Sequence, residues 1–170
     1  MIYFDIRPSA HLPTLELRIS DSCTRVEEVV LLAGLFRALV IWAAAAEYEG
    51  SPLVPVRPEL LHAATWRAAQ SGLQGDLVDP VTAAPVPARQ LIGQLLTELR
   101  PALESTGDWE LVTRLTKSAL AQGCSAARQR TARARGGLRN VVDTLAAETR
   151  ATPPWLKRTR PPHPVVSAAR

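Results

Sequence analysis

A carboxylate and a guanidinium stand two residues apart in the segment Glu16-Leu17-Arg18. In a β-strand, residues i and i+2 point to the same side, roughly 6.5 to 7 Å apart, so both groups would face one site. Phosphoryl-transfer sites combine these groups, because a carboxylate holds the divalent metal that bridges nucleotide phosphates and an arginine offsets charge on the transferred group. The same spacing also fits a solvated ion pair on an exposed sheet face, so spacing alone leaves both interpretations open.

Other polar side chains have less specific chemistry. Arg37 lies inside an apolar segment, where an unpaired cation is costly, so we expect it to meet a carboxylate or a bound anion, with the carboxylate favoured. His11 and His62 have no His, Cys or carboxylate near them at metal-ligand spacing, which favours surface or packing roles. Asp79 precedes Pro80 and predicts a turn.

The strands that must position Glu16 and Arg18 follow from hydrophobic periodicity. Residues 2–7 and 14–20 alternate apolar and polar side chains with a period of two. This alternation predicts two strands, each with one polar face. The link between them has hairpin length and contains Pro8 and Pro13, which is consistent with antiparallel pairing.

After the strands the hydrophobic period becomes helical, and capping residues, prolines and glycines set the helix limits. The expected helices are a first capped near Ser22 or Thr24 that runs to about Tyr48, a second from Pro58 to just before Gly72, a third across residues 91–103 that Pro101 bends, a fourth capped by Asp108 that ends near Gly123, and a fifth around residues 138–145. The pattern predicts an α+β fold with two N-terminal antiparallel strands and a bundle of about five helices.

Residues 29–46 are apolar over a length at which a membrane helix must be considered. Arg37 stands at the middle of this segment, where a charge is costly in lipid, and acidic residues flank both ends. We therefore expect a buried core helix in a soluble, cytoplasmic protein. No cleavable signal peptide precedes the first strand, and Cys23 and Cys124 form no C-x-x-C pair, which favours free thiols in a reducing compartment.

Charge divides the chain into a body and a tail. Residues 1–124 carry 10 of the 20 basic and 14 of the 16 acidic side chains, which leaves 10 basic and 2 acidic side chains in residues 125–170. The proline-rich segment 150–170 has no hydrophobic period, so we expect a disordered basic tail after a domain of residues 1–149. Basic tails can contact nucleic acid, but no base-stacking aromatic motif accompanies this one, and nucleic-acid binding is not expected.

Several short motifs occur in a fixed order along residues 2–149. They are Asp5-Ile6-Arg7-Pro8-Ser9, Pro13-Thr14-Leu15-Glu16-Leu17-Arg18-Ile19-Ser20-Asp21, Leu35-Phe36-Arg37-Ala38-Leu39-Val40, Trp66-Arg67-Ala68-Ala69 with Gly72-Leu73, Leu77-Val78-Asp79, and Gly123-Cys124-Ser125-Ala126 with Arg128-Gln129-Arg130. In order and spacing they resemble the glutamate-cysteine ligase type 2 family of carboxylate-amine ligases. Several motifs in register are far more specific than any one of them.

This resemblance implies a glutamine-synthetase-like fold, in which a curved antiparallel sheet forms a funnel for ATP, Mg²⁺ and an amino-acid substrate. It implies that ATP converts the carboxylate of glutamate to an acyl phosphate, which the amine of cysteine attacks. Carried onto this chain, the resemblance makes Glu16 a candidate Mg²⁺ ligand and Arg18 a candidate catalytic residue that binds the transferring phosphate. Arg7 would bind a phosphate or a substrate carboxylate, with a salt bridge to Asp5 or Asp21 as an equal alternative.

The later motifs are less decisive. Arg128 and Arg130 could reach nucleotide phosphates, but they could equally begin the solvated basic tail. Gln70 stands where the family motif usually has a basic residue, so any contact made by that residue is in doubt here.

Members of the family are about twice this length, and their N-terminal part supplies further metal-binding carboxylates. We therefore expect a C-terminal portion of such a ligase, which needs a second chain carrying the N-terminal half, or self-association, and is inactive alone. The alternative is a non-catalytic interaction module or a truncated remnant of a ligase.

Overall fold

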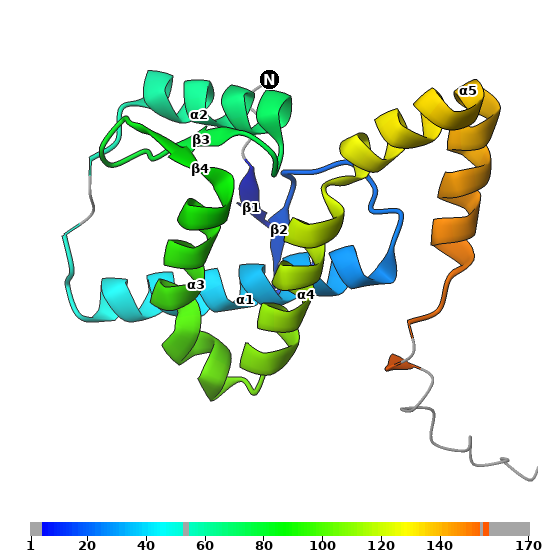
Figure 1. Ribbon diagram of the computed structural model, residues 1–170. Helices are drawn as coiled ribbons and strands as arrows, with labels where there is room; N and C mark the ends of the chain where they lie inside the picture. The colour runs from blue at the N-terminus through cyan, green and yellow to red at the C-terminus, as the bar shows by residue number, and fades with distance from the viewer. Residues whose placement is uncertain (1–4, 53–54, 154, 157–170) are drawn as a thin grey trace, which may run out of the picture.

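The computed structural model describes residues 5–52, 55–153 and 155–156, which form an α+β structure (Figure 1). In chain order its elements are β1 (Ile6–Pro8), β2 (Leu15–Leu17), α1 (Val26–Tyr48), α2 (Pro58–Ser71), β3 (Asp76–Val78), β4 (Pro85–Pro87), α3 (Ala88–Ser105), α4 (Trp109–Gln122) and α5 (Ser125–Arg150). The predicted fold class is confirmed. The start of the first predicted strand and most of the predicted tail lie outside the described residues.

Strands β1 and β2 pair antiparallel and place Arg7 directly opposite Glu16. Strand β2 is shorter than predicted, with three residues, and β1 also has three among the described residues. Beyond Pro8 the backbone N–H of Ser9 still donates to the carbonyl of Thr14 at 2.8 Å, so the hydrogen bonding continues into the loop. Arg18 follows the end of β2, and its backbone N–H donates to the carbonyl of Asp5 at 2.7 Å.

A second hairpin, β3–β4, lies between α2 and α3 and was not predicted. The two prolines that bound β4 are typical of loops or edge strands, which hid this short strand in the sequence. Asp79 forms its turn, as predicted: its carboxylate accepts hydrogen bonds from the Val81 backbone and the Thr82 hydroxyl, both at 2.8 Å. These bonds lower the pKa of Asp79.

The core lies where α3 and α4 pack against one side of α1, and Figure 1 shows both helices crossing α1. Its fully enclosed members are Ala38, Leu99, Ala102, Leu103 and Val112. Helix α3 supplies three of them from one stripe and continues through Pro101 as a helix. Helix α2 has no buried residue and packs mainly against β3.

Helix α1 is less buried than expected. Its length is as predicted, but only Gly34 and Ala38 are buried, and large apolar side chains such as Val29 and Trp42 are exposed. The expectation of a buried core helix is wrong because α3 and α4 cover one side of α1 only. Among the described residues, α1 is the only helix long and apolar enough to cross a membrane, a test that core helices of soluble proteins also pass.

Two predicted helix caps differ in detail. Helix α1 begins after Arg25, not after Ser22 or Thr24. Asp108 is the N-cap of α4 by position, but its side chain makes no capping bond, because it accepts hydrogen bonds from Arg37 and from the Thr106 hydroxyl.

The fifth predicted helix is the second part of a longer one. Helix α5 is interrupted at Gly136 and Gly137, and Gly137 has a φ of 67°, a conformation that favours glycine. The side-chain amide of Asn140 donates to the carbonyl of Ala132 at 2.8 Å and joins the two parts across this break.

Substitutions at two helical glycines can distinguish the effect of helix propensity on stability from the effect of packing. A Cβ at Gly34 would lie 2.6 Å from a methyl carbon of Val112, whereas a Cβ at Gly93 in α3 would meet nothing within 4 Å. We expect Gly93→Ala to raise the free energy of unfolding by about 0.5 to 1 kcal/mol through helix propensity. We expect Gly34→Ala to lower it by about 1 to 2 kcal/mol, because overpacking against buried Val112 outweighs the same gain.

Urea unfolding followed by circular dichroism measures both changes. Adding Val112→Ala should make Gly34→Ala less harmful than it is in the wild-type background. Equal stabilisation by the two glycine substitutions would show that α1 and α4 do not approach as closely as described.

Candidate functional site

The β1–β2 hairpin brings two of the predicted site residues together. The Nε of Arg7 lies 2.7 Å from a carboxylate oxygen of Glu16, so Arg7 pairs with Glu16 and not with Asp5 or Asp21. Their side chains are 49% and 39% exposed, and an exposed pair of this kind contributes little to stability. The ion pair can therefore open, and Arg7 or Glu16 can bind a ligand instead, with little loss of stability.

Arg18 is exposed and follows β2 directly. Within the described part of the chain its side chain has no hydrogen bond or ion pair, so its guanidinium is available for an anion. Arg7 and Arg18 therefore give this part of the chain two cationic groups and one carboxylate, and guanidinium groups are well suited to binding phosphate.

The described residues do not form a metal site by themselves. They contain no cluster of three or more His, Cys, Asp or Glu side chains that could hold an ion. Glu16 provides a single carboxylate, which Arg7 already neutralises. A Mg²⁺ ion uses protein carboxylates together with substrate phosphates and water, so Glu16 fits as one ligand of a site completed by other groups.

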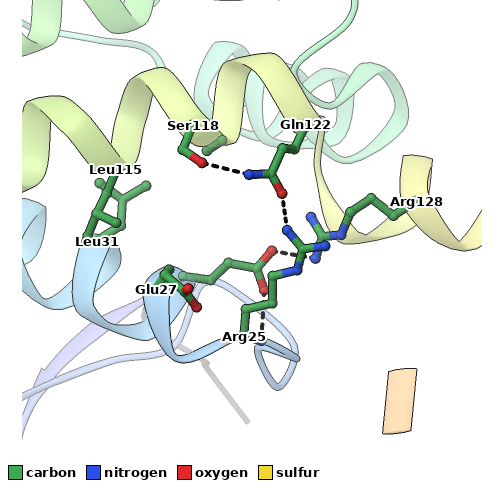
Figure 2. Close-up of a pocket in the computed structure, with 9 residues that line it drawn as sticks. Arg25, Glu27, Leu31, Leu115, Ser118, Gln122 and Arg128 are labelled. Carbon is green, nitrogen blue, oxygen red and sulfur yellow. Dashed lines mark hydrogen bonds and ion pairs between the residues drawn. The ribbon is translucent and has the colours of Figure 1, made fainter. Parts of the chain in front are cut away.

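A second polar cluster joins segments far apart in the sequence. We call it the Glu148 cluster, and it consists of Thr24, Arg25, Glu28, Arg128 and Glu148. The Glu148 carboxylate accepts hydrogen bonds from Thr24 at 2.5 Å, from Arg25 at 2.6 Å and from Arg128 at 2.8 Å. The cluster thereby ties the N-terminus of α1 to both parts of α5, and Arg25 extends it to Gln122 at the end of α4 (Figure 2).

Arg128 is held firmly in this cluster. Its Nε binds Glu148, one terminal nitrogen donates to the Gly123 carbonyl at 2.9 Å, and the other donates to Glu28 at 2.6 Å and to Thr24. A guanidinium has five N–H donors, so at most one remains for a nucleotide. This geometry favours a structural role, and the nucleotide-binding role of Arg128 stays a prediction. Arg130 is exposed and has no side-chain partner among the described residues.

The cluster shifts the titration of its members. Burial would raise the pKa of Glu148, but hydrogen bonds from Arg128, Thr24 and Arg25 outweigh it and hold that pKa at about 2. Burial alone would lower the pKa of Arg128, yet Glu148 and Glu28 raise it above its ordinary value. Both residues are therefore charged at neutral pH and stabilise each other.

Two cavities lie beside the cluster. A small one of about 60 Å³ is lined by residues that include Arg25, Glu27, Leu31 and Leu115, and Figure 2 shows these side chains around it. A larger one of about 490 Å³ lies in the bend of α5, where its lining includes Arg135 and Asn140. Arg128 lines both cavities, but none of the hairpin residues lines either of them.

Arg37 and the two cysteines have structural roles. Arg37 forms an ion pair with Asp108, as the favoured alternative predicted, and this hydrogen bond lowers the pKa of Asp108 despite partial burial. Cys23 and Cys124 are free thiols. Burial, with a contribution from the charge of Glu28, raises the pKa of Cys23, so this thiol is not activated as a nucleophile.

The sequence did not reveal the Glu148 cluster. Arg25 and Glu148 lie 123 positions apart, and no local motif relates them. The only signal was that Glu148 is one of two acidic residues in a basic C-terminal region, which marks a candidate for pairing but not its partners.

The low pKa of Glu148 makes stability dependent on pH. In the unfolded chain its pKa lies near the ordinary value of 4.5, so its contribution is complete above that pH and is lost as the pH falls towards 2. At pH 7 we expect Glu148→Gln to lower the free energy of unfolding by about 3 kcal/mol, because two arginines lose their shared carboxylate.

The check is denaturant unfolding between pH 7 and pH 2. The wild type should lose more stability than Glu148→Gln over this range. Glu104→Gln removes an exposed pair with Arg100 and serves as the control, with an expected change below about 0.5 kcal/mol. Parallel pH profiles for wild type and Glu148→Gln would contradict the cluster.

Comparison with known proteins identifies the family. The model of the glutamate-cysteine ligase family 2 matches residues 1–144. The chain is 57% identical over 155 residues to a Frankia casuarinae protein provisionally named glutamate-cysteine ligase 2-2. It is 52% identical over 150 residues to a similarly named protein of Mycolicibacterium smegmatis, and 42% identical over 149 residues to one of Rhodopirellula baltica.

These matches cover 91%, 88% and 87% of this chain, but only 18%, 38% and 39% of the three relatives. The chain therefore spans less than half the length of these curated relatives, as the prediction of a portion of a longer enzyme requires. Because the family model matches most of its length, the chain belongs to the glutamate-cysteine ligase family 2.

Proposed function

We propose that this chain supplies part of the active site of an ATP-dependent carboxylate-amine ligase that joins glutamate to an amine such as cysteine. The observation that carries the proposal is the β1–β2 hairpin, which combines Arg7, Glu16 and the exposed Arg18 within a family match that covers residues 1–144. The names of the relatives, which refer to glutamate and cysteine, support the choice of substrates.

In this proposal ATP phosphorylates the glutamate carboxylate, and the amine then displaces phosphate from the acyl phosphate. Arg18 binds the phosphoryl group as it transfers and stabilises its charge, because preorganised cations act most strongly where charge develops. Arg7 binds a phosphate or the substrate carboxylate, for which it exchanges its present partner Glu16. Glu16 would hold Mg²⁺, whose role when bound is to neutralise phosphate charge.

Other carboxylates must complete the site, since the described residues offer no metal cluster. We propose that another polypeptide region of the ligase provides them, either on a second chain or through self-association. The ligase would act in the cytoplasm, where ATP and reduced cysteine are both present.

The lack of a metal cluster among the described residues also favours a second candidate, a non-catalytic interaction module of the family. This module would keep the helices and the Glu148 cluster without turnover. Measuring activity in the assembled complex separates the two candidates.

The proposal predicts that turnover depends on both assembly and Arg18. The isolated chain should release negligible ADP with glutamate and cysteine, because one carboxylate does not hold the metal ions that phosphoryl transfer requires. In a complex with the complementing region of a relative, Arg18→Ala should lower kcat by roughly 10²- to 10³-fold, the range for losing one transition-state donor. Glu16→Gln should raise the Mg²⁺ concentration needed for half-maximal rate.

Arg100→Ala is the matched control, because Arg100 is an exposed arginine whose only ion pair among the described residues is the local one with Glu104. Its kcat should stay within about twofold of the wild type. Fast turnover by the isolated chain would overturn the assembly argument. Unchanged kcat in Arg18→Ala would remove Arg18 from the mechanism, and no ADP release by any complex would favour the non-catalytic module.

A further inference from the structure

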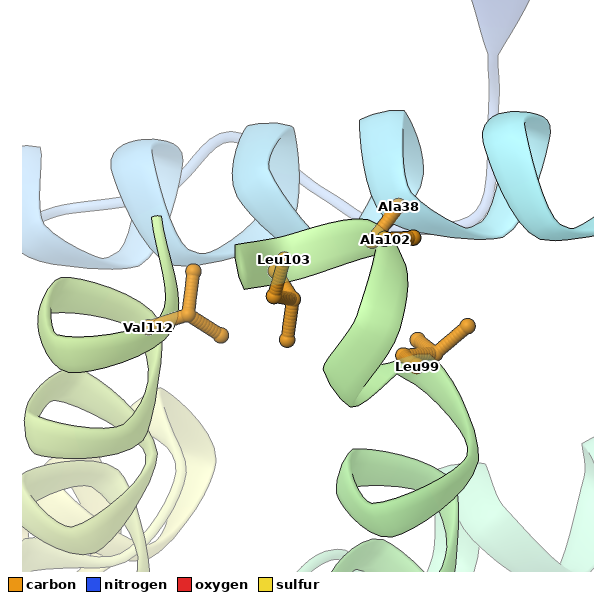
Figure 3. Close-up of a cluster of buried hydrophobic side chains, with 5 residues drawn as sticks. All are labelled: Ala38, Leu99, Ala102, Leu103 and Val112. Atoms are coloured by element: carbon orange, nitrogen blue, oxygen red, sulfur yellow. The ribbon is translucent and has the colours of Figure 1, made fainter. Parts of the chain in front are cut away.

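Between its acidic ends helix α1 is apolar except for Arg37, which pairs with Asp108, yet the described structure covers only one side of the helix. Its packed side faces α3 and α4, where Ala38 contacts the core cluster shown in Figure 3. At helical spacing on the opposite side lie Val29, Ala33, Phe36 and Val40, which we call the outer face of α1. Val29 and Ala33 are exposed, and Phe36 and Val40 are half-buried. A helix that is hydrophobic all round is normally enclosed, so the outer face requires a cover.

A lipid bilayer does not fit this geometry. Helix α3 contacts α1 near its midpoint through Leu99, Ala102 and Leu103. The same turns of α3 carry the exposed charges of Arg100 and Glu104. If α1 crossed a membrane, these charges would lie near the bilayer centre, which costs several kcal/mol for each.

A second copy of this chain is also disfavoured, because both ends of α1 are acidic. Glu27 lies at the N-terminal end, Glu47 and Glu49 lie at the C-terminal end, and none of the three forms an ion pair within the described residues. Any two-fold pairing of α1 with its copy, parallel or antiparallel, brings acidic ends together. Like charges at such an interface oppose association.

The charges instead specify a partner with basic side chains. The last turn of α1 has no basic residue, although cations stabilise the C-terminal end of a helix. A lysine or arginine of a partner at this end would interact favourably with Glu47 and Glu49 and also with the helix dipole. The curated relatives contain such additional polypeptide, because the match covers 38% of the Mycolicibacterium smegmatis protein and 39% of the Rhodopirellula baltica protein.

We propose that the outer face of α1 is the docking surface for a second region of the ligase, which has an apolar face and basic residues beside the C-terminal end of α1. This inference rests on the proposed function only in naming that partner, because docking itself needs neither ATP nor turnover. It assigns the long apolar helix to assembly of the enzyme.

The test co-expresses this chain with the part of the Mycolicibacterium smegmatis relative that lies outside the 150 matched residues. Size-exclusion chromatography with light scattering should show a 1:1 complex. Ala33→Asp places a charge on the outer face and should weaken binding at least tenfold, whereas Glu47→Lys should weaken it severalfold. The control Val142→Asp changes another exposed apolar residue, on α5, and should bind within twofold of the wild type.

A chimera provides a second test that does not require the partner segment to be soluble on its own. In the chimera, this chain replaces the matched region of the relative, and thermal unfolding is measured. Ala33→Asp should lower the Tm of the chimera by several degrees more than it lowers the Tm of the isolated chain, because only the chimera buries the new charge.

Three results would overturn the proposal. The first is that Ala33→Asp lowers the Tm of the chimera and of the isolated chain equally, or leaves binding of the partner segment unchanged. The second is a stable dimer of the isolated chain that Ala33→Asp dissociates, which would assign the outer face to a second copy. The third is sedimentation of the isolated chain with phosphatidylcholine vesicles, which would assign it to a membrane. Binding and Tm are measured without any assay of ligase activity. Failure of the docking proposal is therefore distinguishable from failure of the proposed function.

Discussion

The packing of α3 and α4 on one side of α1 is the interaction on which the rest of the described structure depends. Leu99 and Leu103 of α3 and Val112 of α4 are buried in one cluster with Ala38 of α1, and Gly34 lets Val112 approach α1 closely. Each buried Leu or Val side chain contributes about 1.5 to 3 kcal/mol. The small number of such residues explains why the Glu148 cluster matters: it holds the N-terminus of α1 and the bent α5 by charge instead of by apolar burial.

The sequence predicted features that depend on neighbours along the chain. The hydrophobic period gave the first strands and the lengths of α1, α2 and α4, and Pro58 and Gly123 marked helix ends where expected. The same reasoning failed where contacts between distant segments decide the outcome. Arg7 pairs with Glu16 because the strand register places them opposite each other, whereas the salt-bridge partners expected from the sequence were Asp5 and Asp21.

Burial was the other property that periodicity did not predict. An apolar helix such as α1 carries no pattern that tells which side will be covered, so its exposed outer face became visible only in three dimensions. The short strands β3 and β4 were hidden for a different reason, since three residues are too few to show a period and two of the three residues in β4 are prolines. The sequence also did not predict that Arg128 pairs with Glu28 and Glu148.

The chain thus separates two tasks: exposed groups on the hairpin remain available for a ligand, while the partly buried Arg128 of the Glu148 cluster is committed to the fold. The most direct test is a crystal structure of this chain in complex with the complementing ligase region, Mg²⁺ and a non-hydrolysable ATP analogue. The account predicts that the guanidinium of Arg18 lies within about 3 to 4 Å of an oxygen of the γ-phosphate. A nucleotide whose phosphates lie away from the hairpin, beside Arg128 or on another surface, would contradict it.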